Sequence, residues 1–151
     1  MKVLLIMILG ISSSYGATSG TLVISGTVPS IISVEVSPEA LASNLPLDTT
    51  QVSSKIATIN ESSNSANGYQ VSISSDNLGK LIHETVLTSE INYVLTYGGN
   101  TVDLSSGDVF NYLAPESGVD KDINISYTGT PHESLIEGDY GDTITFSITA
   151  N

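Results

Sequence analysis

The sequence predicts an antiparallel β-sandwich of immunoglobulin-like type, and three observations support this prediction. First, several segments alternate apolar and polar residues with the period of two that a half-buried strand requires. Second, Gly, Asn and Pro separate these segments at short intervals, which is typical of an all-β domain with roughly seven or eight strands. Third, helical periodicity is almost absent, and the composition is rich in Ser, Thr, Val and Ile, which favours strands. We find neither an internal repeat nor a linker, so the sequence predicts one domain.

The N-terminal residues have the pattern of a removable secretion signal. A short basic start precedes an apolar run over residues 3–11, and small residues follow at Ser14 and Gly16. This pattern predicts cleavage before Ala17. A membrane-spanning anchor is the alternative, but it needs about 20 apolar residues, and this run has about half that length. We therefore expect residues 1–16 to be a signal peptide and the remaining chain to be exported.

The charge balance is strongly acidic. Lys and Arg together number 4 against 16 Asp and Glu, which gives a formal net charge of −12 at pH 7. A surface of this sign repels phosphate backbones and anionic lipids, so we expect neither nucleic acid nor a lipid membrane as a partner. The simplest role of the charge is solubility outside the cell. Cysteine is absent, so no disulfide holds the exported domain together.

A strand-like apolar segment follows the expected cleavage site. Leu22, Ile24 and Val28 fall on one face of an extended chain, with Gly26 as a gap between them. Pro29 ends the segment because it has no N–H group to continue a ladder. A mature N-terminus is usually polar and poorly ordered. This segment is instead suited to burial in a sheet, either its own or that of another molecule.

The rest of the chain is predicted as a series of short strands. Alternation identifies the strands, Asn67 followed by Gly68 is a strong hairpin signal, and two prolines confine residues 38–46 to a loop or a short helix. The glycines after Tyr97 supply the positive φ angles that a tight turn needs. In order, the predicted elements are strands at 32–36 and 52–59, a polar turn at 60–68, a strand at 69–74, a hairpin at 91–104, and strands at 123–127 and 144–148.

The residues that could carry chemistry show no catalytic or metal-binding pattern, so we expect that the chain is not an enzyme and binds no cofactor or metal. His83 and His132 are far apart in the sequence, and each is expected in a surface loop. No Ser lies in a Gly-x-Ser-x-Gly motif. Carboxylates are so abundant that a close pair arises by chance, which gives no evidence of a glycosidase.

Two acidic segments are candidate ion sites. In residues 120–124 the acid spacing suits a calcium loop, but Ile125 stands where a glycine is needed, and a strand with a polar outer face explains the pattern. Residues 137–142 are a better candidate for a loose ion site, with a solvated turn as the simpler interpretation. Asn60 and Asn124 begin glycosylation sequons, which are short enough to arise by chance.

Three segments occur in chain order: the alternation over 22–28 that leads into Ile31 and Ile32, the strand 91–97 followed by Gly98 and Gly99, and the Gly-x-Tyr pattern at 138–140 that precedes the last strand. Together they resemble the major subunits of chaperone–usher fimbriae, especially the cysteine-free alternate class that includes colonization-factor pilins. The likeness covers most of the mature chain. The archaic pilins of spore-coat-U type share the Gly-x-Tyr pattern but usually carry cysteines that this chain lacks.

The resemblance implies a sandwich that lacks its last strand and is completed by donor-strand addition. A periplasmic chaperone first fills the groove, and an outer-membrane usher exchanges it for the N-terminal strand of the next copy, giving a filament on the cell surface. A host or surface receptor is a further candidate partner. The implied organisation is 1–16 signal peptide, 17–29 donor-strand extension and 30–151 pilin-like domain. The implied donor residues are Leu22, Ile24, Gly26 and Val28, and the implied acceptor-groove residues are Ile32, Val34, Val36, Ile144, Phe146 and Ile148.

Alternatives remain open from the residues alone. The same alternation in residues 21–28 serves a first strand that pairs within its own domain. The chain would then be a self-contained secreted β-sandwich that binds a carbohydrate or a surface without polymerising. An enzyme is the third alternative and has the least support. The sequence gives no receptor and does not distinguish a shaft subunit from a tip subunit.

Overall fold

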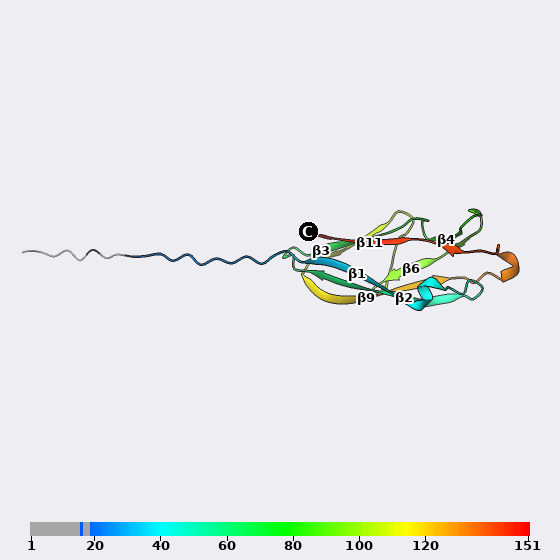
Figure 1. The fold of residues 1–151 in the computed structure, drawn as a ribbon, viewed down its shortest axis with the longest axis horizontal. Coiled ribbons are helices and arrows are strands. Elements are labelled where there is room, and N and C mark those ends of the chain that lie inside the picture. The colour runs from blue at the N-terminus through cyan, green and yellow to red at the C-terminus, as the bar shows by residue number, and fades with distance from the viewer. Residues whose placement is uncertain (1–15, 17–18) are drawn as a thin grey trace, which may run out of the picture.

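The computed structural model describes Gly16 and residues 19–151, and its fold is almost entirely β (Figure 1). The expected signal peptide lies outside the described residues apart from Gly16. No helix in the described part of the chain is long and apolar enough to cross a membrane. The elements in chain order are β1 (Ile32–Pro38), the short 3-10 helix η1 (Ala40–Ser43), β2 (Gln51–Ser63), β3 (Tyr69–Ser75), β4 (Lys80–His83), β5 (Glu90–Asn92), β6 (Val94–Tyr97), β7 (Asn100–Thr101), β8 (Asp108–Tyr112), β9 (Glu116–Tyr127), the 3-10 helix η2 (His132–Ser134), β10 (Tyr140–Gly141) and β11 (Ile144–Ala150).

The strands form two facing layers. One layer is a five-stranded sheet in the order β1-β2-β9-β6-β7. The other layer contains two three-stranded sheets: β11-β3-β8, and β10-β4-β5, which has shorter strands and continues the first along the molecule (Figure 1). The strand pairs are antiparallel throughout these sheets. The predicted antiparallel, immunoglobulin-like sandwich is therefore confirmed.

The core lies between the layers and consists of the inward-facing residues of each strand. The alternation predicted this arrangement in β3, where Tyr69, Val71 and Ile73 are buried, and in β9, where Ile123 and Ile125 are buried. Tyrosine supplies much of the core volume, and each buried ring needs a partner for its hydroxyl group. The buried hydrophobic residues are Ala57, Ile59, Tyr69, Val71, Ile73, Leu81, Ile91, Tyr93, Leu95, Tyr97, Val102, Leu104, Ile123, Ile125 and Tyr127.

The expectation of a polar turn over residues 60–68 is wrong at its start. β2 continues to Ser63, and its inward alternation passes from Ile59 to Glu61 and Ser63, which are all buried. Only the last part turns, where Gly68 has φ +80° and a Cβ atom would lie 1.9 Å from the carbonyl oxygen of Tyr112. The sequence does not reveal the end of this strand, because its inward residues are polar. These side chains are buried all the same, since they form hydrogen bonds with other polar groups.

Three further expectations differ from the structure. The strand expected over 91–97 is divided at Tyr93 into β5 and β6, which belong to different sheets. His83 is not in a surface loop, because it ends β4 and is buried, whereas His132 is exposed as expected. The short strand expected over 101–104 ends at Thr101, although Val102 and Leu104 are still buried in the turn that follows. The strands β4, β8 and β10 were not predicted, because their sequences are too short or show too little alternation.

Candidate functional site

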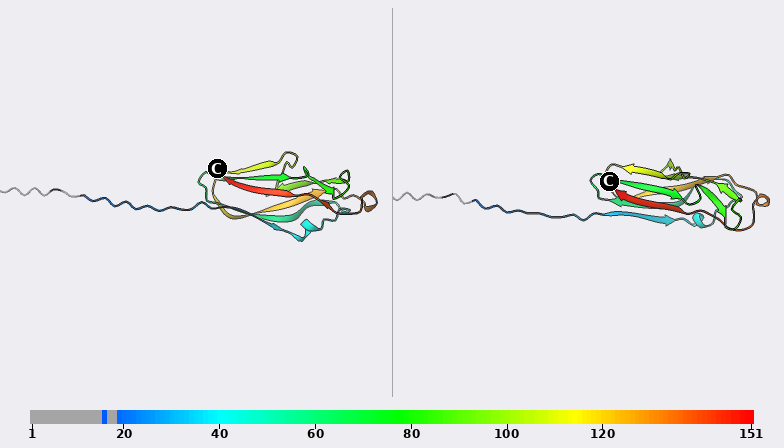
Figure 2. Two further views of the ribbon diagram at one scale, coloured as in Figure 1. Left: turned by 45° about the horizontal axis from the view of Figure 1, so that its top comes forward. Right: turned by 90° about the horizontal axis from the view of Figure 1, so that it is seen from above.

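The N-terminal segment lies apart from the domain. Residues 19–31 belong to no strand or helix and extend from one end of the sandwich (Figure 2). Leu22, Ile24 and Val28 are 81%, 86% and 83% exposed, and a Cβ atom on Gly26 would meet no atom within 4 Å. The predicted donor residues thus form an apolar strip that no part of the described chain covers. Such exposure is unfavourable in water, which makes the segment a candidate for binding elsewhere.

The domain has a matching open side where its two layers meet. β1 pairs only with β2, and β11 pairs only with β3, so each strand has one free edge within the described chain. Cα atoms of β1 and β11 approach to within 8 Å of each other. We call these two free edges, with their six inward apolar side chains, the open edge. The six are Ile32, Val34, Val36, Ile144, Phe146 and Ile148.

Side chains at the open edge are only partly covered. Val34, Ile144, Phe146 and Ile148 pack against the core but remain half-buried. Ile32 and Val36 are exposed. The structure therefore places all six residues predicted for the acceptor groove on two neighbouring edge strands.

The turn at residues 64–68 fixes both strands of the open edge at one end. The side chain of Asn64 accepts a hydrogen bond from the Ile31 amide at 2.8 Å and donates one to the Pro29 carbonyl at 2.8 Å. At the same turn, the Asn151 amide donates to the Gly68 carbonyl at 3.0 Å. β1 therefore begins where β11 ends, and the two strands run in opposite directions. We call the end with this turn the near end and the opposite end the far end.

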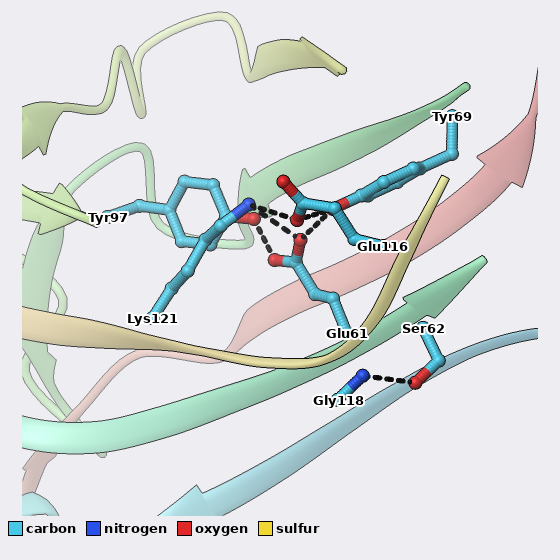
Figure 3. A network of polar contacts seen from close by, with 7 residues as sticks. All are labelled: Glu61, Ser62, Tyr69, Tyr97, Glu116, Gly118 and Lys121. Carbon is cyan, nitrogen blue, oxygen red and sulfur yellow. Dashed lines mark hydrogen bonds and ion pairs between the residues drawn. The ribbon is translucent and has the colours of Figure 1, made fainter. Parts of the chain in front are cut away.

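A buried polar cluster lies behind the open edge (Figure 3). Glu61, directly opposite Val34 in the β1–β2 register, is fully buried. Its carboxylate accepts hydrogen bonds from the hydroxyl groups of Tyr97 and Tyr69, the latter at 3.0 Å. The Lys121 ammonium lies 2.9 Å from the same carboxylate. Burial and the hydrogen bonds to carboxylates raise the pKa of Tyr69 well above its usual value.

Lys121 is the cation that this cluster requires. Its nitrogen lies 3.3 Å from the ring centroid of Tyr112, a cation–π contact, and 3.7 Å from the Glu116 carboxylate. Burial lowers the pKa of Lys121, but interactions with Tyr112 and Glu61 outweigh burial, and the pKa is raised overall. No buried side-chain nitrogen or oxygen in the described chain lacks a hydrogen-bond partner. The cluster thus joins the two layers through hydrogen bonds and an ion pair.

Asp142 holds the start of β11 in place. Its carboxylate accepts hydrogen bonds from the hydroxyl groups of Ser75 and Tyr93, both at 2.6 Å, and from the Asn77 amide at 3.0 Å. Burial and the bond to Asp142 raise the pKa of Tyr93 well above its usual value. These contacts anchor the open edge toward its far end.

The far end carries a cavity of about 640 Å³ between residues 44–48 and 132–140. The cavity has mixed walls, with Leu45 and Leu135 beside Asp48 and His132, and Nε2 of His132 lies 3.2 Å from the Asp48 carboxylate at the surface. Among the described residues, no group of at least three His, Cys, Asp or Glu side chains is placed to hold a metal ion. Residues 137–142 instead contain β10, which pairs with β4, and Asp142, whose carboxylate accepts a hydrogen bond from Ser75.

The Gly-x-Tyr pattern has a structural explanation. Gly138 has φ +144° and lies against the ring of His83, whose Nε2 is 2.9 Å from the Glu137 carbonyl oxygen. The Tyr140 ring meets His83 edge to face, with centroids 5.0 Å apart. The Nδ1 atom of His83 accepts hydrogen bonds from two backbone amides, so the imidazole carries its proton on Nε2. The Gly-x-Tyr pattern is visible in the sequence. Its partner His83 could not be predicted, because that residue belongs to the distant strand β4.

Comparisons with known proteins find little at the level of sequence. No protein-family model and no curated protein matches the chain. Among solved structures, the CssB subunit complemented with a donor strand from the CssA subunit, of enterotoxigenic Escherichia coli colonization factor CS6, is similar. The match has a TM-score of 0.49 and 18% identity, and it covers 78% of this chain and 83% of that chain.

Proposed function

We propose that this chain is the structural subunit of a surface fimbria that polymerises by donor-strand complementation and supports adhesion. Residues 22–28 of one copy fill the open edge of the next copy. One observation carries the proposal: an exposed apolar segment and an uncovered apolar sheet edge occur in the same chain. Each feature alone favours aggregation. In a pair of copies, the apolar segment of one copy covers the sheet edge of the other.

The energetic gain from this contact is substantial. Burial of Leu22, Ile24 and Val28 is worth roughly 5 kcal/mol before the cost of ordering the segment. A copy with an empty open edge is prone to aggregation, so a periplasmic chaperone covers the edge and an outer-membrane usher exchanges the chaperone for the next copy. Residues 1–16 are removed on export, so that the extension begins at Ala17.

The directions of the strands decide whether the assembly is open or closed. An inserted strand antiparallel to β11 ends at the far end, so the domain that donated it lies beyond the far end. Opposite ends of successive copies then meet, and this contact repeats without closing, which gives a filament. The reverse direction would bring two near ends together and permit reciprocal exchange in a closed dimer. We propose the direction antiparallel to β11.

A pair of aspartate substitutions tests the proposal. In the single chain, Ile24 and Val23 are 86% and 83% exposed, so either substitution leaves the isolated domain unaffected. In the filament, Ile24 faces the core of the next copy and Val23 faces water. We expect Ile24→Asp to abolish filaments seen by electron microscopy, because a charge would be buried without a partner. We expect Val23→Asp to retain them.

Three results would contradict the proposal. Equal assembly of the two variants would show that neither face of residues 22–28 is buried selectively against a partner. A wild-type chain that stays monomeric in light scattering when exported would favour the self-contained binding module. A discrete dimer would contradict the proposed strand direction.

A further inference from the structure

The segment and the edge that it would fill match in length and in charge. This inference rests on the proposed function. β11 has 7 residues, and residues 22–28 are equally long. Neither stretch contains a charged side chain. Charge therefore cannot set the register between them, and the register must come from the sizes of the facing side chains.

Only every second register is allowed, because the apolar faces must both point inward. Ile144, Phe146 and Ile148 are half-buried and pack on the core, while Thr145 and Ser147 between them are exposed. A shift by one residue would turn the apolar strip of the extension to water. The allowed registers differ by two residues, and size must choose among them.

We propose that Gly26 of one subunit lies opposite Phe146 of the next, with the inserted strand antiparallel to β11. Phe146 has the largest side chain on the inward face of β11, and Gly26 has no side chain. The gap in the apolar strip then becomes the space that the aromatic ring occupies in the completed sandwich. The other inward pairs in this register are Leu22 with Ala150, Ile24 with Ile148, and Val28 with Ile144.

The pair at the near end also places a large residue opposite a small one, but here the large residue belongs to the extension and the small one to β11. Leu22 and Ile24 are the largest inward residues of the extension. In this register Leu22 lies opposite Ala150, which is the smallest inward residue of β11. Large residues thus face small ones at two positions. Medium-sized aliphatic residues face each other at the remaining two, which keeps the packing volume even along the edge.

The outward faces agree with this register. Thr27 lies opposite Thr145, and Ser25 lies opposite Ser147. Hydroxyl groups that face each other across antiparallel strands are favourable pairs on an exposed sheet surface. The outer face would therefore be polar along most of its length, as the exposed residues of β11 already are.

The neighbouring registers are worse for identifiable reasons. A shift by two residues in one direction places Val28 against Asp142, whose carboxylate already binds Ser75 and Tyr93. A shift in the other direction leaves Leu22 past Ala150, the last residue of β11, without a facing strand residue. Both shifts also place Phe146 opposite a branched side chain, either Ile24 or Val28, which would overfill the site.

Cysteine cross-linking tests the register directly, because the chain has no cysteine of its own. Full-length chains carry Ile24→Cys together with Ile148→Cys, with Phe146→Cys or with Ala150→Cys. Directly opposed residues have Cβ atoms about 4.5–5.5 Å apart, whereas diagonal neighbours are about 7–8 Å apart. We expect disulfide-linked ladders on non-reducing gels for the pair with Ile148, at least about tenfold stronger than for the other two pairs.

A size exchange gives a second test. Gly26→Val should abolish filaments, and Phe146→Ala in the same chain should restore them, because the smaller residue makes room for the larger one. The register is wrong, with the proposed function intact, if filaments form but the strongest ladder comes from the pair with Phe146 or Ala150. It is also wrong if Gly26→Val assembles normally. Absence of both filaments and ladders in every form would overturn the proposed function and the register together.

Discussion

The carboxylate of Glu61 is fully buried and lies 2.9 Å from the ammonium nitrogen of Lys121. The two residues come from the adjacent strands β2 and β9 of one layer, and Tyr69 from β3 of the other layer binds the same carboxylate. Burial of two charges is costly, and their attraction offsets that cost only when every remaining hydrogen bond is made. This cluster meets the condition and so fixes the distance between the layers at the near end, directly behind Val34.

Replacing Lys121 with Met should destabilise the domain strongly. The substitution keeps most of the side-chain volume but leaves Glu61 buried without its cation, which costs on the order of 3 kcal/mol. The control is Lys80→Met, which breaks a 2.8 Å ion pair with Glu90 near the surface. That change should cost less than about 1 kcal/mol. Urea unfolding of the full chain measures both, and similar losses for the two variants would contradict the role of the cluster.

The buried tyrosines should make the domain sensitive to alkali. The pKa values of Tyr69 and Tyr93 are raised from the usual 10.0, so the folded state favours their neutral forms. Their contribution is complete below pH 10 and is lost as the pH rises toward the folded-state pKa values. Lys121, whose pKa is raised from 10.5, acts in the same direction.

We therefore expect the free energy of unfolding to fall steeply above about pH 10. Tyr93→Phe should be less stable than the wild type at neutral pH, because it loses the bond to Asp142, but its stability should fall less steeply with alkali. Ile73→Val is the control, because it weakens the core without removing a titrating group. Parallel pH profiles for all three chains, from urea unfolding at several pH values, would contradict this prediction.

Alternation was sufficient to predict most of the sandwich. Where inward residues are apolar, as in β3 and β11, a period of two fixes both the strand and its buried face. The six residues of the open edge followed from that periodicity together with the resemblance to fimbrial subunits. Their position on two neighbouring free edges depends on the order of strands in the sheets, which alternation alone does not contain.

Apart from β4, β8 and β10, which are too short or alternate too little, several of the features that were not predicted have polar inward residues. Glu61 and Lys121 look like surface residues in the sequence, because nothing local shows that each will meet the other across β2 and β9. His83 was misplaced for the same reason, since its partner at Gly138 lies far along the chain. Buried polar groups are satisfied by tertiary contacts, and such contacts leave no local signal in a single sequence.

Gly138→Ala should destabilise the far end. A Cβ atom there would lie 2.4 Å from Nε2 of His83, and φ is +144°, a conformation that residues with side chains rarely adopt. We expect a loss of about 2 kcal/mol or more from combined clash and strain. Gly141→Ala is the matched control, because it has ordinary φ and no atom within 4 Å. Thermal melts compare the two, and equal melting temperatures would mean that the close contact between Gly138 and His83 is unimportant.

The most demanding prediction is that the chain can complete itself. A copy of residues 17–29 is fused after Asn151 through a flexible linker of a few residues, and the original 17–29 is removed. The end of β11 lies at the near end, so the copy can turn back there and run antiparallel to β11 along the open edge. Tethering raises its local concentration to the order of millimolar, so it should outcompete any neighbouring molecule.

The fused chain should be a soluble monomer that folds without a chaperone. Burial of three apolar side chains, worth roughly 5 kcal/mol, should raise its melting temperature above that of the intact mature chain by on the order of 15 °C. The matched control carries Ile24→Asp in the fused copy and should lose this gain. Light scattering and thermal melts separate the outcomes. If the intact chain is already monomeric and fusion adds no stability, the segment has no place at the open edge and the fimbrial proposal fails.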